Sequence, residues 1–289
     1  MLVSMENSLP DIVNDQFIER LNSADVKLGL FNFREIWQYR HMLWHLVIRD
    51  LKSRYKQTVL GILWSMVNPF VTMVLFTFVF GELANVPTYN IPYPVFSFAA
   101  LVPWTFFARC MTVIPYSLLA NSSLITKIYF PRILLPLAAL ITSVVDFVIA
   151  FVMLLVLMVI FHVSLSVSTI IWIPFFTLLL TLTSLGLGLV LAALNVHMRD
   201  IGYLLPFLLQ GFQFLSPIAY STNLLHEPLQ TLAGLNPLVA VCDGYRWALL
   251  GIDSFHPAAI VLSTISSVAI LMFGYVVFRR MEPTFSDVI

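Results

Sequence analysis

The sequence predicts an all-α integral membrane protein with six transmembrane helices. Of its 289 residues, 60% are hydrophobic and only 10% are charged, whereas a soluble domain is usually about 25% charged. Apolar runs with almost no charge recur along the chain, and several are long enough to cross a hydrocarbon core of about 30 Å. The formal net charge is zero, so composition gives no reason to expect nucleic acid as a partner.

The chain divides into three predicted parts. Residues 1–32 form a cytoplasmic polar segment in which we recognise no chemistry. Residues 33–56 place apolar side chains at helical spacing and basic groups largely on the other side, which is typical of an amphipathic helix in the membrane interface. A helix packed on the rest of the protein is the alternative. Residues 57–289 form the six-span transmembrane domain.

We expect the six spans at about 59–80, 95–120, 133–161, 169–194, 201–215 and 258–278. Pro69 follows Asn68 inside the first span, and because proline removes a backbone donor we expect a kink there. The stretch 216–256 holds apolar pieces that are too short to span and are broken by Pro, Gly and Asn. Pieces of this kind predict re-entrant segments, here two half-helices near 222–232 and 237–250.

The basic residues predict the orientation. With six spans, the N-terminus, the loops 121–132 and 195–200 and the C-terminus share one side. Of the 15 Lys and Arg residues, all except Arg109 and Arg246 fall on that side. Positively charged loops face the cytoplasm, so we expect a multi-pass protein with both termini cytoplasmic and with the loop 82–94 and the stretch 216–256 facing outward.

Several catalytic motifs are missing from the sequence. It contains no GxxxxGK[ST] and not even a Gly-Lys pair, so the chain cannot cradle ATP phosphates in a P-loop. HExxH, GxSxG, a cysteine pair at zinc spacing and paired catalytic carboxylates are also missing. We therefore expect no enzyme activity, no metal site and no cofactor in this chain.

Two ionisable pairs have both a structural and a functional interpretation. Arg109 lies within the second span, where charge is costly. It either meets an anionic ligand or lines a pathway, or it snorkels or pairs with Asp146 of the third span, and Asp146 is its natural partner in either case. Asp243 and Arg246 are three residues apart on a short outward helix. They could form a brace along one helix face or contact a substrate.

Five blocks carry a family resemblance. The stretch RDLKSRYKQTVLGILWSMVNPF resembles the signature of ABC-2 type polysaccharide export permeases, the membrane subunits of transporters for O-antigen, capsular polysaccharide and teichoic acid. PVFSFAALVPWTFF, LITKIYFPRILLPL, NVHMRDIGYLLPFLLQ and FRRMEPTFSDVI match the same family in the right order. The resemblance covers about residues 33–289. O-antigen exporters of Gram-negative bacteria are the most similar branch.

The resemblance implies an assembly. Two copies of the chain would form a homodimer, with a polymer channel at their interface made mainly by the first and fifth spans. Two copies of a separate P-loop ATPase subunit, which would bind ATP and Mg, would dock on the cytoplasmic loops. The outward half-helices would form a periplasmic gate. The residues we assign to these roles are Asn68, Pro69, Phe76, Phe212 and Phe214 for the channel, Lys127, Phe130, Pro131, Arg132, Arg199 and Asp200 for docking, and Pro217, Tyr220, Asn236, Pro237, Asp243 and Arg246 for the gate.

The resemblance also implies the substrate, a polysaccharide on a lipid carrier, commonly undecaprenyl diphosphate, in the bacterial inner membrane. Directly before the charge-free first span stands a basic cluster, Arg49, Lys52, Arg54 and Lys56, which we expect to recruit the lipid diphosphate. A capsule or teichoic acid exporter is the alternative within the family. A small-molecule efflux permease and a membrane glycosyltransferase or polymerase are the more distant ones.

Overall fold

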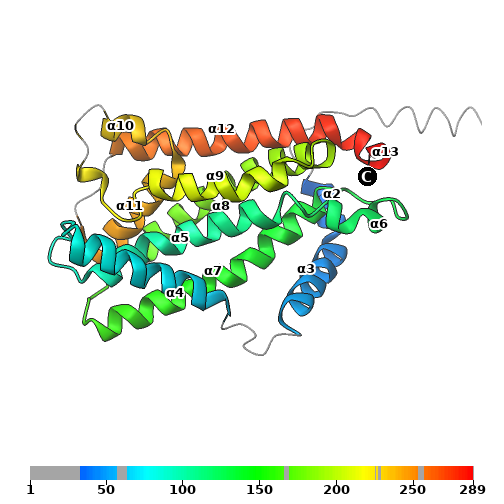
Figure 1. Ribbon diagram of the computed structural model, residues 1–289. Coiled ribbons are helices and arrows are strands. Elements are labelled where there is room, and N and C mark those ends of the chain that lie inside the picture. Colours follow the sequence, from blue (N-terminus) through cyan, green and yellow to red (C-terminus); the bar gives the residue numbers. More distant parts are fainter. Residues whose placement is uncertain are drawn as a thin grey trace, which may run out of the picture. The chain divides into compact units, whose positions relative to one another are not determined.

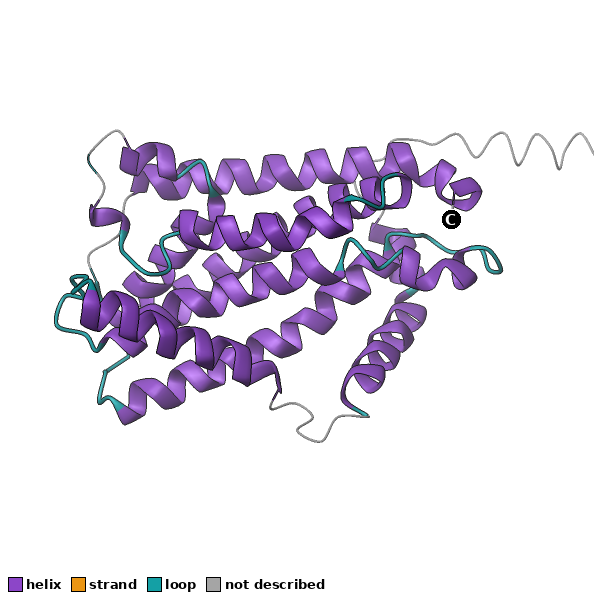
Figure 2. Ribbon diagram, viewed as in Figure 1, coloured by secondary structure: helices purple, strands orange, loops and turns teal. Residues whose placement is uncertain are grey.

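The computed structural model describes residues 33–56, 64–165, 169–224, 226, 229–252 and 257–288. The predicted segment 1–32 and the first residues of the first predicted span lie outside this part of the chain. The protein consists of two units, Met1–Tyr39 and Arg40–Ile289. The described regular elements of both units are helices, as predicted (Figure 2).

The predicted interface helix is two helices in the structure. Helix α2 (Phe33–Gln38) belongs to the first unit, and α3 (Arg40–Tyr55) opens the second. Leu46 and Val47 of α3 are buried, and α3 packs against α7 (Leu134–Ile160). Trp44 remains 60% exposed. One face of α3 therefore packs on the protein, and its position at a membrane interface stays a prediction.

Five described helices are long and apolar enough to cross a membrane: Ser65–Leu83, Tyr93–Val113, Leu134–Ile160, Ile171–His197 and Pro257–Thr284. They correspond to α4 (Trp64–Phe76) with its π-helical continuation η2 (Thr77–Leu83), α5 (Tyr93–Val113), α7, α8 (Thr169–His197) and α12 (Pro257–Met281). The remaining predicted span is the shorter apolar helix α9 (Ile201–Leu215). The protein is thus multi-pass, and a sixth crossing stays a prediction.

The second span was predicted too long at its C-terminal end. Helix α5 stops at Val113, and the chain turns before the short helices η3 (Leu119–Asn121) and α6 (Ser122–Ile125). Pro115 has no amide hydrogen with which to continue the helix. Its carbonyl instead accepts a 3.0 Å hydrogen bond from the Asn195 amide of α8. Pro69 lies inside α4, where the kink stays a prediction.

The region between α9 and α12 contains one substantial half-helix. Helix α11 (Pro237–Leu250) has the predicted bounds. The Asn236 side chain caps it by accepting from the Leu238 amide, and Gly251 ends it with a φ of 70°. The other predicted half-helix is much shorter, because only η4 (Thr222–Leu224) and α10 (Leu229–Ala233) are helical among the described residues there. Re-entry into a membrane stays a prediction for both.

The core of the second unit is a bundle of α5, α7, α8 and α12 (Figure 1). Helix α11 packs against α5 and α8, and α8 pairs closely with α12. Glycines make that pairing possible. A Cβ at Gly186 would stand 2.7 Å from backbone atoms of Ile270 and Leu271, and small residues at a crossing let two helices approach.

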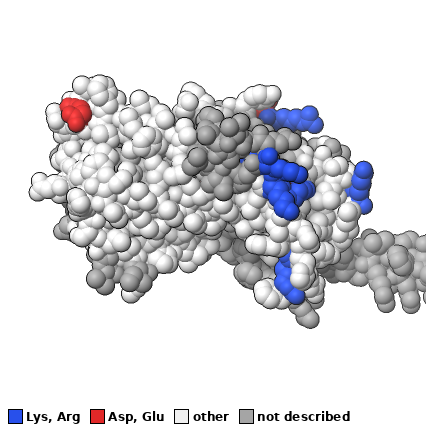
Figure 3. Space-filling view, turned by 90° about the horizontal axis from the view of Figure 1, so that it is seen from below, with Lys and Arg blue, Asp and Glu red and all other residues white. Residues whose placement is uncertain are grey.

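Contacts group the loops at two ends as the topology predicts. At one end, Tyr93 donates to the Ala219 carbonyl over 2.9 Å, which joins the loop 82–94 to the start of 216–256. At the other, the Arg132 amide bonds Glu282 at 3.2 Å and His197 meets Thr284 at 3.1 Å. On the face in Figure 3, Lys and Arg gather toward one end. The compartment of each end stays a prediction.

Candidate functional site

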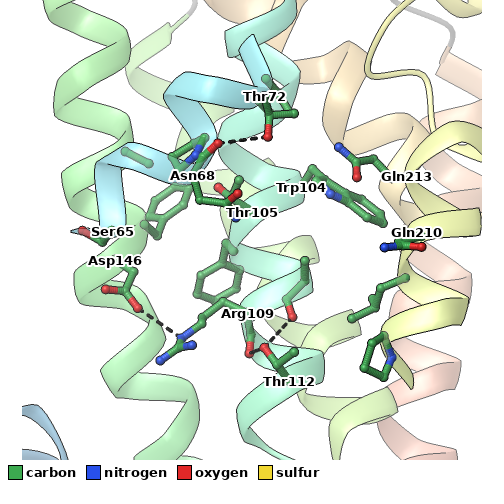
Figure 4. Close-up of a pocket in the computed structure, with 18 of the residues that line it drawn as sticks. Ser65, Asn68, Thr72, Trp104, Thr105, Arg109, Thr112, Asp146, Gln210 and Gln213 are labelled. Carbon is green, nitrogen blue, oxygen red and sulfur yellow. Dashed lines mark hydrogen bonds and ion pairs between the residues drawn. The ribbon is translucent and has the colours of Figure 1, made fainter. Parts of the chain in front are cut away.

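A polar cavity of about 620 Å³ opens among α3, α4, α5, α7 and α9. Its walls combine aromatic rings with hydroxyl, amide and charged groups (Figure 4). The polar lining residues are Arg54, Ser65, Asn68, Thr72, Thr105, Arg109, Thr112, Asp146, Gln210 and Gln213. Such a set is unusual among helices otherwise built from Leu, Val and Phe, and polar groups at membrane depth mark pathways or binding sites.

Helical spacing places the amides of the cavity. Asn68 and Thr72 are four residues apart on α4, and Gln210 and Gln213 are three apart on α9, so each pair shares one face of its helix. Figure 4 shows the two glutamines across the cavity from Asn68. The Thr72 hydroxyl donates to the Asn68 carbonyl over 2.9 Å, which satisfies that hydroxyl within α4.

An arginine pair meets one carboxylate at the cavity wall. Arg54 Nη1 lies 2.6 Å from Asp146 Oδ2, and Arg109 Nε lies 3.4 Å from the same oxygen. The predicted pairing of Arg109 with Asp146 is confirmed, and the role of Arg109 toward a ligand or a pathway stays a prediction. The sequence did not predict the contact between Arg54 and Asp146. Arg54 belongs to the basic cluster before the first span, and Asp146 lies 92 residues further along the chain.

The other residues of the predicted recruitment group, Arg49, Lys52 and Lys56, do not line the cavity. Arg49 Nη2 bonds Asp50 at 2.8 Å and the Asn121 side chain at 2.6 Å. Lys52 and Lys56 are exposed. The structure thus separates Arg54 from the rest of the predicted recruitment group.

The predicted channel residues fall into two sets. Asn68 and Pro69 line the cavity, whereas Phe76 is buried and packs edge-on against Phe80, with ring centroids 5.3 Å apart. Phe212 and Phe214 are exposed by 45% and 63% on the surface of α9. Their role in a channel stays a prediction.

The predicted docking residues share the end that carries the C-terminal segment. Lys127, Arg199 and Asp200 are exposed, whereas Phe130 and Pro131 are buried. The Arg132 guanidinium donates to the Glu282 carbonyl, and the Glu282 carboxylate also binds Arg279 at 2.8 Å. We did not predict a role for Glu282, because nothing in the local sequence marks it.

The predicted gate residues include a buried brace. Arg246 is fully buried and donates to the carbonyls of Pro217 and Tyr220 over 2.7 Å each and of Ile218 over 2.5 Å. Its contact with Asp243, at 3.2 Å, confirms the predicted pairing.

Asp243 extends the brace toward η4. Its carboxylate accepts from the backbone amide of Thr222 at 3.3 Å and from the Thr222 hydroxyl. Burial raises the pKa of the Asp243 carboxyl, while the Arg246 guanidinium and the two Thr222 hydrogen bonds oppose that rise. Asn236 and Pro237 form the start of α11. Whether this region opens as a gate stays a prediction.

The comparison with protein families decides the class of this molecule. A family model described as ABC-2 type transporter matches residues 41–250. The chain belongs to this family. The matched range runs from α3 to the end of α11 and contains every residue that lines the cavity. The resemblance seen in the sequence blocks is therefore confirmed.

Curated relatives of this ABC-2 family member are named for O-antigen export and for polysialic acid transport. The O-antigen export system permease protein RfbA of Myxococcus xanthus is 29% identical over 216 residues, covering 74% of this chain and 82% of that protein. An RfbA of Klebsiella pneumoniae is 25% identical over 83% of this chain and 92% of its own length. The polysialic acid transport protein KpsM of Escherichia coli is 21% identical over 71% of this chain and 80% of its own.

Proposed function

We propose that this chain is the permease subunit of an ATP-driven exporter that moves a lipid-linked polysaccharide across the bacterial inner membrane. O-antigen on undecaprenyl diphosphate is the substrate we favour, because relatives named for O-antigen export align over 82% and 92% of their length. The observation that carries the proposal within the structure is the polar cavity between α4 and α9.

The two helices α4 and α9 are unlike lipid-facing helices. Both carry exposed large apolar residues, among them Phe70 at 45% and Phe207 at 73% exposure. Both also direct exposed amides, Asn68 and Gln210, into the cavity. An amide facing lipid tails would lose its hydrogen bonds to water, so such residues favour a water-filled or substrate-filled path. Aromatic faces and amides together suit a passing sugar chain.

A second copy of the chain would complete this path. Residues of α4 and α9 line the cavity, and a homodimer that joins these helices would supply a further wall. The transported polymer would then pass between two equivalent surfaces, which agrees with the closed two-fold symmetry that most homodimers adopt.

Energy would come from a partner, because the sequence has no P-loop. Two ATPase subunits, which bind ATP and Mg, would dock at Lys127–Arg132 and Arg199–Asp200. Helix α7 begins at Leu134 and α9 at Ile201, directly after these loops. A push on the loops would therefore move one wall of the cavity relative to α4. Arg49, Lys52 and Lys56 would attract the lipid diphosphate to the same end, and the stretch 216–256 would close the outward end.

A capsular polysaccharide exporter is the second candidate, because the chain also resembles the polysialic acid transport protein KpsM. Its 21% identity is lower than the 29% and 25% found with the O-antigen permeases. We therefore rank it after O-antigen export.

An export assay tests the proposal in cells that lack the native gene. We expect a double variant, Asn68→Leu and Gln210→Leu, to reduce surface polysaccharide by about tenfold or more, since two amides that line the cavity and meet the passing glycan are lost. The variant Val261→Leu on α12, where Val261 is 59% exposed, is the matched control. Normal surface polysaccharide at equal protein abundance in the double variant would contradict the proposal.

Cysteine cross-linking tests the homodimer. The native Cys110 and Cys242 are buried and should react little. We expect Val71→Cys on α4 and Phe207→Cys on α9 to form disulfide-linked or maleimide-linked dimers in membranes, whereas Val261→Cys on α12 should stay monomeric on a denaturing gel. Dimers through α12 alone would place the interface elsewhere.

A further inference from the structure

The cluster of Arg54, Arg109 and Asp146, here called the two-arginine cluster, carries an excess of positive charge. Both guanidinium groups converge on a single carboxylate oxygen, Asp146 Oδ2. Among the described residues that line the cavity, these three are the charged ones, so the lining has a formal charge of +1. The side chains are 23%, 38% and 17% exposed, respectively, so each is largely withdrawn from solvent yet reachable from the cavity.

The depth of the cluster makes the excess charge significant. Asp146 is twelve residues after the start of α7 at Leu134, about 18 Å along a helix that rises 1.5 Å per residue. Charged groups within apolar helices are costly and are kept where they pair or bind. Two guanidinium groups side by side therefore favour a second anion, and arginine forks match phosphate oxygens by paired, charge-assisted hydrogen bonds.

The rest of the cavity differs from its charged end. Asn68, Gln210 and Gln213 offer amides, and the indole ring of Trp104, which is 4% exposed, also lines the cavity. In Figure 4 Arg109 and Asp146 lie toward one end of the cavity and Asn68, Trp104 and Gln213 toward the other. Amides bind hydroxyl groups, and an aromatic face stacks on a sugar ring. The cavity thus offers an anion site next to a sugar site, which is the order of groups in a glycosyl phosphate.

We propose that the two-arginine cluster is a binding site for a phosphate or diphosphate group, and that Asp146 occupies the position of that anion when the cavity is empty. The arriving phosphate takes over the hydrogen bond that Arg54 makes with Asp146 and the ion pair that Arg109 makes with it, and Asp146 is released from both. The identification of the group with a lipid carrier rests on the function proposed above. The site itself rests on the geometry of the cluster.

This exchange predicts that one substitution increases, rather than decreases, the affinity for phosphate. In Asp146→Asn the competing negative charge is gone while an amide of nearly the same shape remains, so the phosphate should bind several-fold more tightly. Arg54→Gln and Arg109→Gln should each weaken binding by about tenfold or more, because a hydrogen bond to a charged group is worth about 1.5 kcal/mol or more. If Asp146 only held α3 and α5 against α7, Asp146→Asn would weaken phosphate binding instead.

Binding can be measured on the full-length chain in phosphatidylcholine nanodiscs by titration calorimetry. The probes are farnesyl diphosphate, inorganic pyrophosphate and farnesol, and a fourth arm replaces half of the phosphatidylcholine by phosphatidylglycerol. Arg280→Gln, an exposed charge on α12, is the matched control, and Arg109→Lys tests rescue by charge alone. Size-exclusion profiles show whether each variant is folded.

We expect farnesyl diphosphate to bind and farnesol not to bind. The affinity for farnesyl diphosphate should fall in the order Asp146→Asn, wild type, Arg109→Lys, Arg109→Gln. Pyrophosphate binding with the same variant dependence supports the site and assigns it to free phosphates, and competition by phosphatidylglycerol assigns it to lipid headgroups. The proposal is overturned if none of the substitutions in the two-arginine cluster changes the affinity for farnesyl diphosphate. It is also overturned if Asp146→Asn weakens binding. Intact binding in a chain that fails to export polysaccharide would instead refute the proposed function.

Discussion

At the residue scale, Arg246 makes the most demanding contacts in the described part of the chain. Its side chain is completely buried, and a buried cation is tolerated only when its charge and its N–H donors are matched. Three consecutive or nearly consecutive carbonyls, those of Pro217, Ile218 and Tyr220, together with Asp243, provide the match. A single side chain thus fixes the path of the chain after α9.

Replacing Arg246 by leucine should be strongly destabilising. The change removes the cation that faces the buried Asp243 carboxylate and leaves several carbonyls without donors, so we expect a loss of stability of about 3–5 kcal/mol and a clear drop in the melting temperature of purified protein. Arg246→Lys keeps the positive charge but not the several N–H donors of the guanidinium group, so we expect an intermediate loss of stability. A melting temperature within a degree or so of the Arg280→Gln control would show that the brace contributes little.

The same scale shows why contacts were harder to predict than residues. Asp243 and Arg246 could be paired from their spacing alone, and Arg109 could be matched to Asp146 because both stand out in apolar spans. The carbonyl partners of Arg246 could not be found in this way, since a carbonyl is present at every position and carries no signal. The contact of Arg54 with Asp146 was missed because Arg54 sits in a run of basic residues.

At the element scale, the crossing of α8 and α12 depends on missing side chains. A Cβ at Gly274 would overlap the backbone of Gly186, and one at Gly186 would stand 2.7 Å from backbone atoms of α12. The hydroxyls of Thr183 and Ser267 meet near this contact at 3.1 Å. Close backbone approach and a hydroxyl pair replace the hydrophobic effect, which does not drive helix association inside a bilayer.

Alanine at these glycines should separate the two helices. We expect Gly186→Ala and Gly274→Ala each to cost about 1–3 kcal/mol, as overpacking does, and to lower the amount of folded protein in detergent. Gly211→Ala in α9 is the control, because a Cβ there meets nothing within 4 Å. Equal thermal stability of all three variants would show that the crossing adapts.

Elements were predictable where local signals agree. Helix α11 has its predicted bounds because Asn236, Pro237 and Gly251 mark both ends. Hydropathy located the spans but not their ends. The π-helical turns of η2 have no hydropathy signal, and α5 ends before Pro115 although the apolar run continues.

At the scale of the whole molecule, the C-terminal segment ties the two predicted docking loops together. Glu282 binds the backbone of Arg132 after α6 and the side chain of Arg279 on α12. Thr284 meets His197 at the end of α8, and Phe285 is buried against Phe278. A force applied to either loop therefore reaches α7, α8 and α12 together.

We expect Glu282→Ala to uncouple ATP hydrolysis by the partner subunit from export by the permease. The change removes the contacts of the Glu282 carboxylate with Arg132 and Arg279, here called the clasp. The ATPase subunit should still co-purify with the permease, while export should fall several-fold and ATP hydrolysis should become less dependent on substrate. Arg280→Gln, on an exposed neighbouring position, should leave both unchanged. Loss of the ATPase from the purified complex would show that Glu282 acts in docking itself, and unchanged export would show that the clasp is not needed.

As the predicted sixth span, α9 would affect the surrounding bilayer through its short length. Its 15 residues rise about 22 Å, roughly 8 Å less than an average hydrocarbon core. Hydrophobic mismatch of this kind is relieved by local thinning of the bilayer. Because α9 also lines the polar cavity, the thinnest membrane would lie beside the cavity wall, where a headgroup leaving the inner leaflet would have the shortest apolar distance to cross.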